Sequence, residues 1–309
     1  MTRVLITGAS GFIGNHLVPR LAKDHTVRCA VRAFGTSSAD WGAQCEIAVV
    51  GDIGPSTRWE DALHGVDLVV HLAALAHKNS PDPEQLERVN VEGLRQLVNA
   101  CEISGVSRIV LLSSIGVLGN KTGQESFTEE SPPCPHDLYS RSKLKGEELL
   151  REKSGQSALE FVIIRPPLVY GPQAPGNFGR VVGIVKRGIP LPFAGLQNRR
   201  SLISVANLVD FIALAVAHPN AANETFVICD GEDVSTPQLF SAIAKACGKR
   251  PRVFYVPLPI LKLAFAGIGK ADYFIRLCES LKVDSTYARE RLGWQPPQSL
   301  EEGLRQACV

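Results

Sequence analysis

The chain has 309 residues, 45% of them hydrophobic and 21% charged, which is typical of a globular protein that buries its core without disulfide or metal support. The formal net charge of +2 gives no electrostatic reason to expect a nucleic-acid partner. Eight cysteines without a C-x-x-C pair indicate a reduced, cytoplasmic chain with buried thiols. The N-terminus enters a strand pattern directly, so we expect no signal peptide, and the most apolar stretch, 253–268, is too short for membrane insertion.

The first predicted element is a strand that ends at a glycine-rich turn and is followed by a helix pattern. The glycines are Gly8, Gly11 and Gly14. Glycine lets the main chain approach a bulky anion, and the N-terminus of the next helix offers free N–H groups to it. The spacing G-x-x-G-x-x-G differs from the commoner G-x-G-x-x-G of dinucleotide folds. It predicts a pyrophosphate site, with an ordinary strand-to-helix turn as the alternative.

Strand and helix patterns alternate through the rest of the first half. The predicted strands are 27–31, 47–50, 68–72, 108–112 and 161–164, and the main helices are 83–104 and 139–153. Helices between strands imply parallel pairing and an α/β fold with a Rossmann-type doubly wound sheet. Ligands bind beyond the carboxyl ends of such strands, where the glycine turn, Asp52, Ala73 and Ser114 would lie together.

From residue 166 onward, prolines and glycines become frequent. We expect a dinucleotide-binding domain over 1–165 and a smaller C-terminal substrate-binding lobe over 166–309, with strands around 201–230 returning to the first domain. The predicted elements of the second part are strands 201–205 and 226–229 and helices 207–217, 237–247 and 287–292.

Tyr139 and Lys143 stand four residues apart at the start of the predicted helix 139–153. On a helix they share one face. An ammonium near a phenol favours the phenolate and lowers its pKa, which makes a tyrosine usable in acid–base chemistry near neutral pH. Ser114, at the end of the strand before this helix, could hold the substrate oxygen. A tyrosine–lysine pair alone is often a surface feature, and its position behind the fifth strand is what favours catalysis.

These motifs together resemble the extended short-chain dehydrogenase/reductase family, also called the nucleotide-sugar epimerase/dehydratase group. The resemblance covers nearly the whole chain in order. Its further motifs are Gly51-Asp52, His71-Leu72-Ala73-Ala74, Asn90, Ser113-Ser114 through Gly119, 165–172 and 292–296.

The resemblance implies that Tyr139 is the general acid/base, that Lys143 lowers its pKa and binds the nicotinamide ribose, and that Ser114 binds the reacting oxygen. Ser114 is preferred to Ser113 because it lies five residues before Gly119. The residues implied at the cofactor are Gly8, Ser10, Gly11, Phe12, Ile13, Gly14, Arg32, Asp52, Ile53, Leu72, Ala73, Ala74, Asn90, Ser113, Tyr139, Lys143, Pro166 and Val169. Asn90 fits a structural or proton-relay asparagine, with a local helix hydrogen bond as the alternative.

Three departures from the family pattern carry information. Ile115 and Gly116 replace the acidic pair of the dehydratases, which disfavours elimination of water because that reaction needs an extra acid and base. Leu118 replaces the usual tyrosine before Gly119 and leaves the sugar preference open. Arg32 follows the second strand where NAD-preferring members carry an acid, which favours NADPH slightly over NAD, although an arginine lying over the adenine would suit either.

The substrate side is also read from resemblance. Arg200 matches an arginine on the substrate pyrophosphate, where a guanidinium makes two parallel bonds to phosphate oxygens. Arg276 is either a second phosphate ligand or a solvated helix arginine. The full substrate set is Ser114, Tyr139, Asn177, Pro192, Phe193, Arg200 and Arg276, with 188–193 as a strand over the nucleobase. No metal is expected, because His77, His136 and His218 lack ligand spacing.

The similar branch comprises bacterial enzymes that reduce or epimerise C4 of UDP-N-acetylhexosamine derivatives for O-antigen and other surface polysaccharide. It implies NAD(P)H-dependent reduction of the 4-keto group of a UDP-2-acetamido-2,6-dideoxy-4-hexulose to a UDP-QuiNAc- or UDP-FucNAc-type sugar. The alternative is a UDP-hexose or UDP-N-acetylhexosamine 4-epimerase with tightly bound NAD. A non-catalytic scaffold is disfavoured by the intact triad, and a non-nucleotide substrate by Arg200 and Asn177. A homodimer through helices 83–104 and 139–153 is expected from the family.

Overall fold

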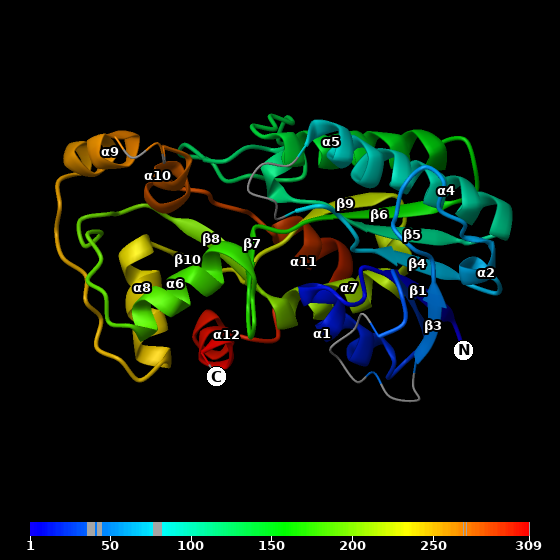
Figure 1. Cartoon of the computed structure of the whole chain (residues 1–309), viewed down its shortest axis with the longest axis horizontal. Helices are drawn as coiled ribbons and strands as arrows, with labels where there is room; N and C mark the ends of the chain where they lie inside the picture. Colours follow the sequence, from blue (N-terminus) through cyan, green and yellow to red (C-terminus); the bar gives the residue numbers. More distant parts are fainter. Residues whose placement is uncertain (36–40, 42–44, 77–81, 268, 270, 309) are drawn as a thin grey trace.

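Seven parallel strands form one sheet in the larger half of the molecule, in the order β3-β2-β1-β4-β5-β6-β9 (Figure 1). The computed structural model describes residues 1–35, 41, 45–76, 82–267, 269 and 271–308. The strands are β1 (Arg3–Thr7), β2 (Thr26–Val31), β3 (Cys45–Val49), β4 (Leu68–His71), β5 (Arg108–Leu112), β6 (Glu160–Arg165) and β9 (Glu224–Val227). The strand order reverses on either side of β1, so the sheet is doubly wound and the predicted fold class is confirmed.

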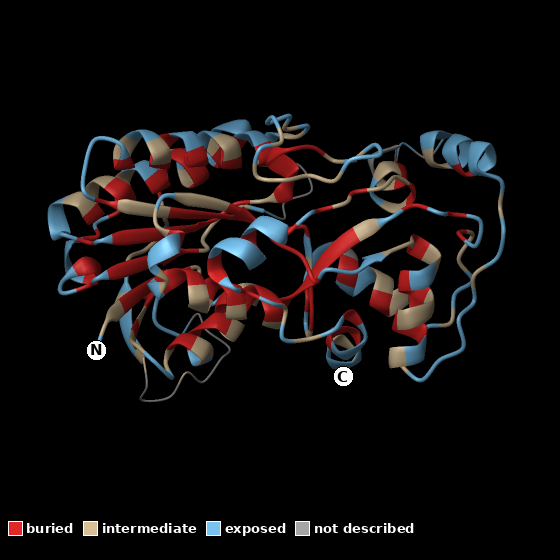
Figure 2. Cartoon of the chain, turned by 180° about the vertical axis from the view of Figure 1, so that it is seen from behind, coloured by how far each residue is buried: buried red, intermediate tan, exposed pale blue. Residues whose placement is uncertain are grey.

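The central strands are buried on both faces because helices cover the sheet on each side. Every residue of β4 and β5 is buried, and both strands read as nearly continuous apolar runs, as parallel strands do. In the middle of the sheet Ile6 pairs with Cys29 on one side and Val70 on the other. Figure 2 shows these strands in the buried colour along their length.

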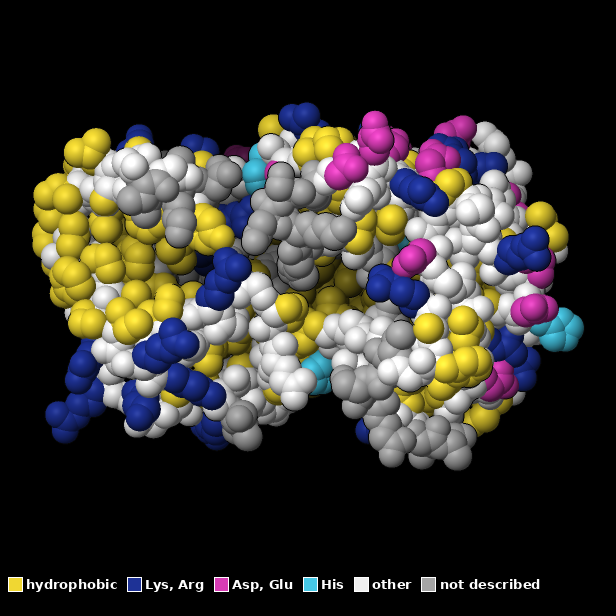
Figure 3. Space-filling model, in the orientation of Figure 1, with side chains coloured by type: hydrophobic (Ala, Val, Ile, Leu, Met, Phe, Trp, Pro, Cys, Tyr) yellow, Lys and Arg dark blue, Asp and Glu magenta, His cyan; other side chains and the backbone are white. Residues whose placement is uncertain are grey.

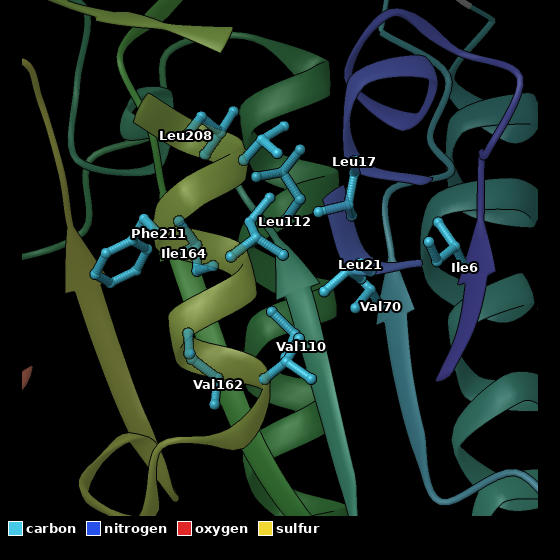
Figure 4. Close-up of a cluster of buried hydrophobic side chains, with 14 of the residues drawn as sticks. Ile6, Leu17, Leu21, Val70, Val110, Leu112, Val162, Ile164, Leu208 and Phe211 are labelled. Carbon is cyan, nitrogen blue, oxygen red and sulfur yellow. The ribbon is translucent and has the colours of Figure 1, made fainter. Parts of the chain in front are cut away.

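Two sets of helices sandwich this sheet. On one face lie α1 (Phe12–Leu21), α7 (Val205–Ala217) and α11 (Thr286–Leu292). On the other lie α2 (Glu60–Leu63), α3 (Pro83–Leu86), the π-helix η2 (Glu87–Glu92), α4 (Gly93–Ser104) and α5 (Leu138–Ser154). Figure 4 shows the first interface, where Leu17 and Leu21 of α1 and Phe211 of α7 lie against strand residues. The apolar spacing of each helix therefore dictates which side chains meet the sheet.

A smaller lobe stands at the other end of the molecule (Figure 1). Its sheet has the order β10-β8-β7, in which β7 and β8 are parallel and β10 and β8 antiparallel. The elements are β7 (Leu168–Tyr170), β8 (Arg200–Ser204), β10 (Asp233–Val234), α6 (Gly176–Lys186), α8 (Thr236–Ala246), α9 (Leu258–Gly267), α10 (Ala271–Cys278) and α12 (Leu300–Ala307). Two short 3-10 helices, η3 (Ile115–Val117) and η4 (Pro219–Ala221), complete the fold.

The structure differs from the sequence prediction at three places. Of the strands expected to return to the main sheet, β9 pairs with β6, whereas β8 lies in the small sheet. The predicted helix 83–104 consists of three segments, because the π-helix η2 interrupts it. The segment 188–193 is not a strand, although Leu191 exchanges backbone hydrogen bonds with Arg252 and Phe254 at 2.8 and 2.9 Å. Contacts distant in sequence decide all three features.

Two expected absences concern membranes and disulfides. Within the described ranges no helix combines the length and the apolar character needed to cross a bilayer. The eight cysteines are unbonded, and Cys29, Cys101, Cys229 and Cys278 are buried.

The first turn needs glycine because the chain packs on itself there. Gly8 has a φ of +69°, and a Cβ at this position would lie 2.8 Å from the backbone nitrogen of Ala73, at the end of β4. A Cβ on Gly14 would overlap the carbonyl oxygens of Gly8 and Ala9. Close approach of backbone to backbone therefore explains these two glycines.

Gly14→Ala should lower the free energy of unfolding by about 1–3 kcal/mol, because the new methyl group forces α1 away from the turn. This loss should exceed the gain of about 1 kcal/mol in helix propensity. Urea titration followed by circular dichroism measures it. Gly123→Ala is the control, since nothing lies within 4 Å of its added Cβ. Equal stability of the two variants would show that the turn can relax.

Candidate active site

The turn after β1 presents a helix N-terminus to the sheet edge. The Gly11 N–H donates to the Gly8 carbonyl at 2.9 Å, and α1 begins at the next residue. No side chain caps this helix, and its first turn holds no acidic residue. The first N–H groups and the positive end of the helix dipole are therefore available to an anion. These residues fit the pyrophosphate of a dinucleotide.

The remaining residues expected at the cofactor follow the carboxyl ends of neighbouring parallel strands. They lie after β1, β3, β4 and β6 and on β7: Ser10, Ile53, Leu72, Ala73, Ala74, Pro166 and Val169. Ser10 is exposed, Pro166 is buried, and the others are partly buried. Parallel strands end at one edge, so the fold gathers these positions along it.

Arg32 and Asp52 form an ion pair at this edge. Arg32 follows β2, and its Nε lies 2.7 Å from Asp52 Oδ1, beyond the end of β3. The two side chains are 73% and 83% exposed, so solvent screens their attraction. The carboxylate that the second strand lacks is thus supplied from the third. A carboxylate here can accept a hydrogen bond from a ribose hydroxyl and would repel a 2′-phosphate.

Helix α5 carries the predicted tyrosine and lysine. Asp137 caps it by accepting a hydrogen bond from the Ser140 N–H at 2.7 Å, which places Tyr139 in the first turn and Lys143 in the next. Tyr139 is partly buried and Lys143 is buried. Burial would raise the pKa of Asp137, but hydrogen bonds from His136 and Ser140 outweigh it and lower that pKa.

The pKa values of the pair differ from the sequence expectation. Burial, reinforced by the charge of Asp137, raises the pKa of Tyr139 to about 12. Burial lowers the pKa of Lys143 to about 8, against the opposing effect of Glu147. The net shift of the Tyr139 pKa is upward, because the cost of removing the phenolate from water is the largest effect on it, and a lowering of this pKa by Lys143 stays a prediction. The phenol keeps its proton until further positive charge lies beside it.

Ser113 and Ser114 have different surroundings at the end of β5. Ser114 opens η3 and its Oγ accepts the Gly116 N–H at 3.1 Å, which leaves its own proton to donate to a substrate oxygen. A Cβ on Gly116 would lie 2.5 Å from the Ser140 Oγ, so η3 packs tightly on α5. Ser113 is buried and donates to Glu147 at 2.5 Å. Packing thus explains why no acid stands at position 116.

Asn90 connects the cofactor edge to the catalytic helix. Its Oδ1 accepts the Leu75 N–H at 2.9 Å, and its Nδ2 donates to the Ser142 Oγ at 2.9 Å. The Ser142 hydroxyl in turn donates to the Tyr139 carbonyl at 2.7 Å. These bonds reach beyond its own helix, so the local alternative does not describe this residue. The π-helix turns it inward, as such segments often do at functional sites.

Two arginines from different elements meet beside the catalytic helix. Arg200 of β8 is partly buried and donates to the Glu279 carbonyl at 3.0 Å. Burial and the positive charge of Arg276 lower its pKa to about 10. Arg276 of α10 lies 3.9 Å from Asp137, the cap of α5. Neighbouring guanidinium groups repel each other unless an anion lies between them, so this pair suits a diphosphate.

Several predicted substrate residues lie elsewhere or outside the description. Phe193 is 4% exposed and packs on Phe240 with ring centroids 5.5 Å apart, so it belongs to the core of the small lobe. Pro192 is partly buried. Asn177 is in the first turn of α6, and its side chain lies outside the described residues, as does His77. Leu118 is buried in an apolar cluster.

Two buried titratable side chains near the site received no role in the sequence analysis, although His71 belongs to one of its motifs. Glu147, fully buried on α5, accepts from Arg165 Nε at 3.0 Å and Nη2 at 2.6 Å. Its only sequence signal is an acid four residues after Lys143. His71 ends β4, and its Nδ1 lies 2.8 Å from the Thr7 Oγ1. No cluster of three metal-ligating side chains occurs among the residues that the structure describes.

The doubly wound sheet thus brings to one edge a glycine turn that fits a dinucleotide and the elements that carry Ser114, Tyr139 and Lys143. This is the arrangement of a dinucleotide-dependent enzyme built on a Rossmann sheet. The chain belongs to the NAD dependent epimerase/dehydratase family, whose model matches residues 4–229. The expected family is confirmed, and the protein is an NAD-dependent enzyme of the nucleotide-sugar epimerase/dehydratase group.

Known proteins resemble it along nearly all of its length. A UDP-glucose 4-epimerase of Vibrio cholerae is 41% identical, over 99% of this chain and 94% of its own. An N-acetyl-α-D-glucosaminyl-diphospho-ditrans,octacis-undecaprenol 4-epimerase of Escherichia coli O157:H7 is 28% identical, over 97% and 92%. The structure of MoeE5 with UDP-glucose and NAD has a TM-score of 0.77 and 28% identity, and covers 99% of this chain and 97% of MoeE5.

His71 should make the protein sensitive to acid. Burial and the charge of Lys143 lower its pKa from 6.5 to about 3. As pH falls below 6.5, His71 therefore takes up a proton in the unfolded chain but stays neutral in the folded chain. Between pH 7 and about pH 4.5 this difference should cost about 2–3 kcal/mol of unfolding free energy.

Urea unfolding of wild type and His71→Asn at the two pH values measures this loss. The variant should be less stable at pH 7, since it disturbs the contact with Thr7, but should lose less on acidification. His64→Asn, at an exposed position, should keep the wild-type difference. The same acid-induced loss in His71→Asn and wild type would contradict the assignment.

Proposed function

We propose that the protein interconverts C4 epimers of a hexose or N-acetylhexosamine held through a diphosphate, with UDP-sugars as substrates and NAD as the resident cofactor. The carrying observation is the placement of Arg200 and Arg276 beside the cap of α5, the helix that bears Tyr139 and Lys143. A diphosphate bound between the two arginines would then place its attached sugar next to Tyr139 and Lys143. The names of both epimerase relatives contain a sugar and a diphosphate or nucleotide carrier, which supports the same assignment.

Each side chain has a distinct task in this reaction. The glycine turn after β1 and Asp52 would hold NAD, which would supply a reversible hydride acceptor for C4 of the sugar. Tyr139 Oη takes the proton of the 4-hydroxyl and gives it back, which is general acid–base catalysis. Ser114 donates its free hydroxyl proton to the sugar oxygen. Lys143 supplies positive charge that opposes the burial of the phenolate.

Epimerisation is better supported than the 4-keto reduction favoured by the sequence analysis. The V. cholerae relative is an epimerase by name and matches over nearly the whole chain. Asp52, paired with Arg32, puts a carboxylate beside the end of β2, which supports NAD over NADPH because a carboxylate there would repel a 2′-phosphate. An enzyme that returns its hydride needs no external reductant, so the two activities are separable by experiment.

The deciding assay incubates the purified protein with UDP-glucose or UDP-N-acetylglucosamine and no added cofactor. The C4 epimer of the sugar should form at constant nicotinamide absorbance. Stoichiometric loss of that absorbance with a UDP-4-keto-6-deoxy sugar and NADH or NADPH, without epimerisation of either UDP-sugar, would establish the reductase instead.

Arg200→Leu should lower kcat/KM for the UDP-sugar by roughly 10- to 100-fold, because charge-assisted hydrogen bonds to the diphosphate are lost. Affinity for NAD, measured by calorimetry, should stay unchanged. Arg199→Leu is the matched control, because Arg199 directly precedes Arg200 in the chain and its own side chain is exposed. Unchanged turnover in Arg200→Leu would remove the diphosphate assignment.

Tyr139→Phe should reduce kcat by about 10²–10⁴-fold, the usual contribution of a general acid or base. NAD should still bind, because the glycine turn and Asp52 are untouched. Tyr255→Phe, at a 68% exposed position of the small lobe, serves as the control. A Tyr139→Phe enzyme with wild-type kcat would require another group to carry the proton.

A further inference from the structure

The outer end of the small lobe exposes an apolar surface. We define the α9 surface as Phe254, Tyr255, Leu258, Ile260 and Leu263, and Leu263 is 75% exposed and Ile260 57%. Figure 2 shows α9 mostly in the exposed colour, and Figure 3 shows a broad hydrophobic field over this end of the molecule. Single exposed apolar residues are ordinary, but a contiguous field marks an interaction site.

This surface is held in place by the lobe. Leu261 is the buried residue of α9 and packs in one cluster with Phe193 and Phe274. The segment leading into α9 is fixed by backbone hydrogen bonds, such as that from the Ala194 N–H to the Phe254 carbonyl at 3.0 Å. A helix that is apolar on nearly all sides is normally covered. The lobe therefore presents an ordered apolar face that lacks its partner.

The charged residues of the segment that carries this face have one sign. From 234 to 271 the sequence has no acidic residue. Lys249, Arg250 and Lys262 are exposed, and Lys186 and Arg187 are exposed at the end of α6, where the Gly188 carbonyl accepts from Arg252 at 3.2 Å. Within the described part of the chain none of these lysines and none of these arginines is ion-paired. Figure 3 shows dark blue side chains along the lower border of the apolar field.

We propose that the α9 surface docks the enzyme on an anionic lipid bilayer. Apolar side chains on a helix enter the boundary between headgroups and acyl chains, while lysines and arginines attract anionic headgroups. A second copy of this chain fits less well, because a two-fold contact would bring two positive borders together. The surface lies on the membrane without spanning it.

Docking has a consequence for substrate choice that rests on the proposed function. Leu191, next to the predicted substrate residue Pro192, is hydrogen-bonded to the segment that leads into α9. The carrier group, attached to the end of the diphosphate opposite the sugar, would then lie near the bilayer. A sugar diphosphate carried by a membrane lipid would reach the site from there, as well as one carried by uridine.

Vesicle flotation of the full-length protein tests the docking. Wild type should float with vesicles of phosphatidylcholine containing roughly one third phosphatidylglycerol, and much less with phosphatidylcholine alone. Leu263→Asp combined with Ile260→Asp should weaken binding by about tenfold or more, since both side chains are exposed and their replacement leaves the core intact. Lys249→Glu with Arg250→Glu should do the same and reduce the salt dependence.

Matched controls lie outside the α9 surface, on segments of the larger half. Ile103→Asp changes an apolar residue of α4 that is 87% exposed, and Lys23→Glu with Lys121→Glu makes the same charge change on exposed lysines. These variants should bind as wild type does. The double variants at Leu263 and Ile260 and at Lys249 and Arg250 should keep wild-type turnover of soluble UDP-sugar.

Absence of wild-type binding, or equal binding of the α9 variants, would overturn the proposal. A change in oligomeric state on sedimentation, in place of lost vesicle binding, would also overturn it and assign the face to a second copy. Flotation requires no turnover, so failure of the epimerase assay with intact vesicle binding would reject the proposed function alone.

Discussion

The buried carboxylate of Glu147 ties the catalytic helix to the central sheet. Arg165, at the end of β6, donates to both of its oxygens, and Ser113, at the end of β5, donates to one of them. Removing one partner of such a buried pair typically costs about 3–5 kcal/mol, because the other charge stays buried without compensation. The pair fixes the rotation of α5, and with it the positions of Lys143 and Tyr139, one and two turns earlier. It also keeps the pKa of Lys143 from falling further.

Local signals were sufficient to predict the parts of the site that depend on local geometry. The glycine turn, the strand ends and the spacing of Tyr139 and Lys143 each follow from a few consecutive residues, and the fold places them on one sheet edge. The Glu147 network joins α5 to two strands far from it in sequence, and no spacing rule relates those three segments. The same holds for Arg200 and Arg276, which come from a strand and a helix that only tertiary packing brings together.

Electrostatic predictions failed where a neighbour in space outweighed a neighbour in sequence. The pKa of Tyr139 was expected to fall because Lys143 is one turn away, but burial acts in the opposite direction and is the larger effect. Arg32 was expected to favour NADPH slightly because β2 ends in no acid, but in the structure it is paired with Asp52, which follows the end of β3. The strand order β3-β2-β1 makes these two ends adjacent. The proposed preference for NAD therefore rests on the sheet topology and not on the second strand alone.

The near-neutral total charge conceals a separation of charge between the two lobes. No acidic residue occurs between Glu160 and Asp210, or between Asp233 and Asp272. All charged side chains within these two segments, which make up most of the small lobe, are therefore positive. In the proposed function, the Arg200 and Arg276 pair would attract a substrate diphosphate, although Asp137 lies 3.9 Å from Arg276 and partly balances its charge. Tyr139 and Lys143, which the proposed function assigns to acid–base chemistry, lie on a helix of the larger half. In that proposal, a sugar diphosphate bridging the halves would relieve repulsion between the arginines of the small lobe while its reacting carbon lies at the larger half.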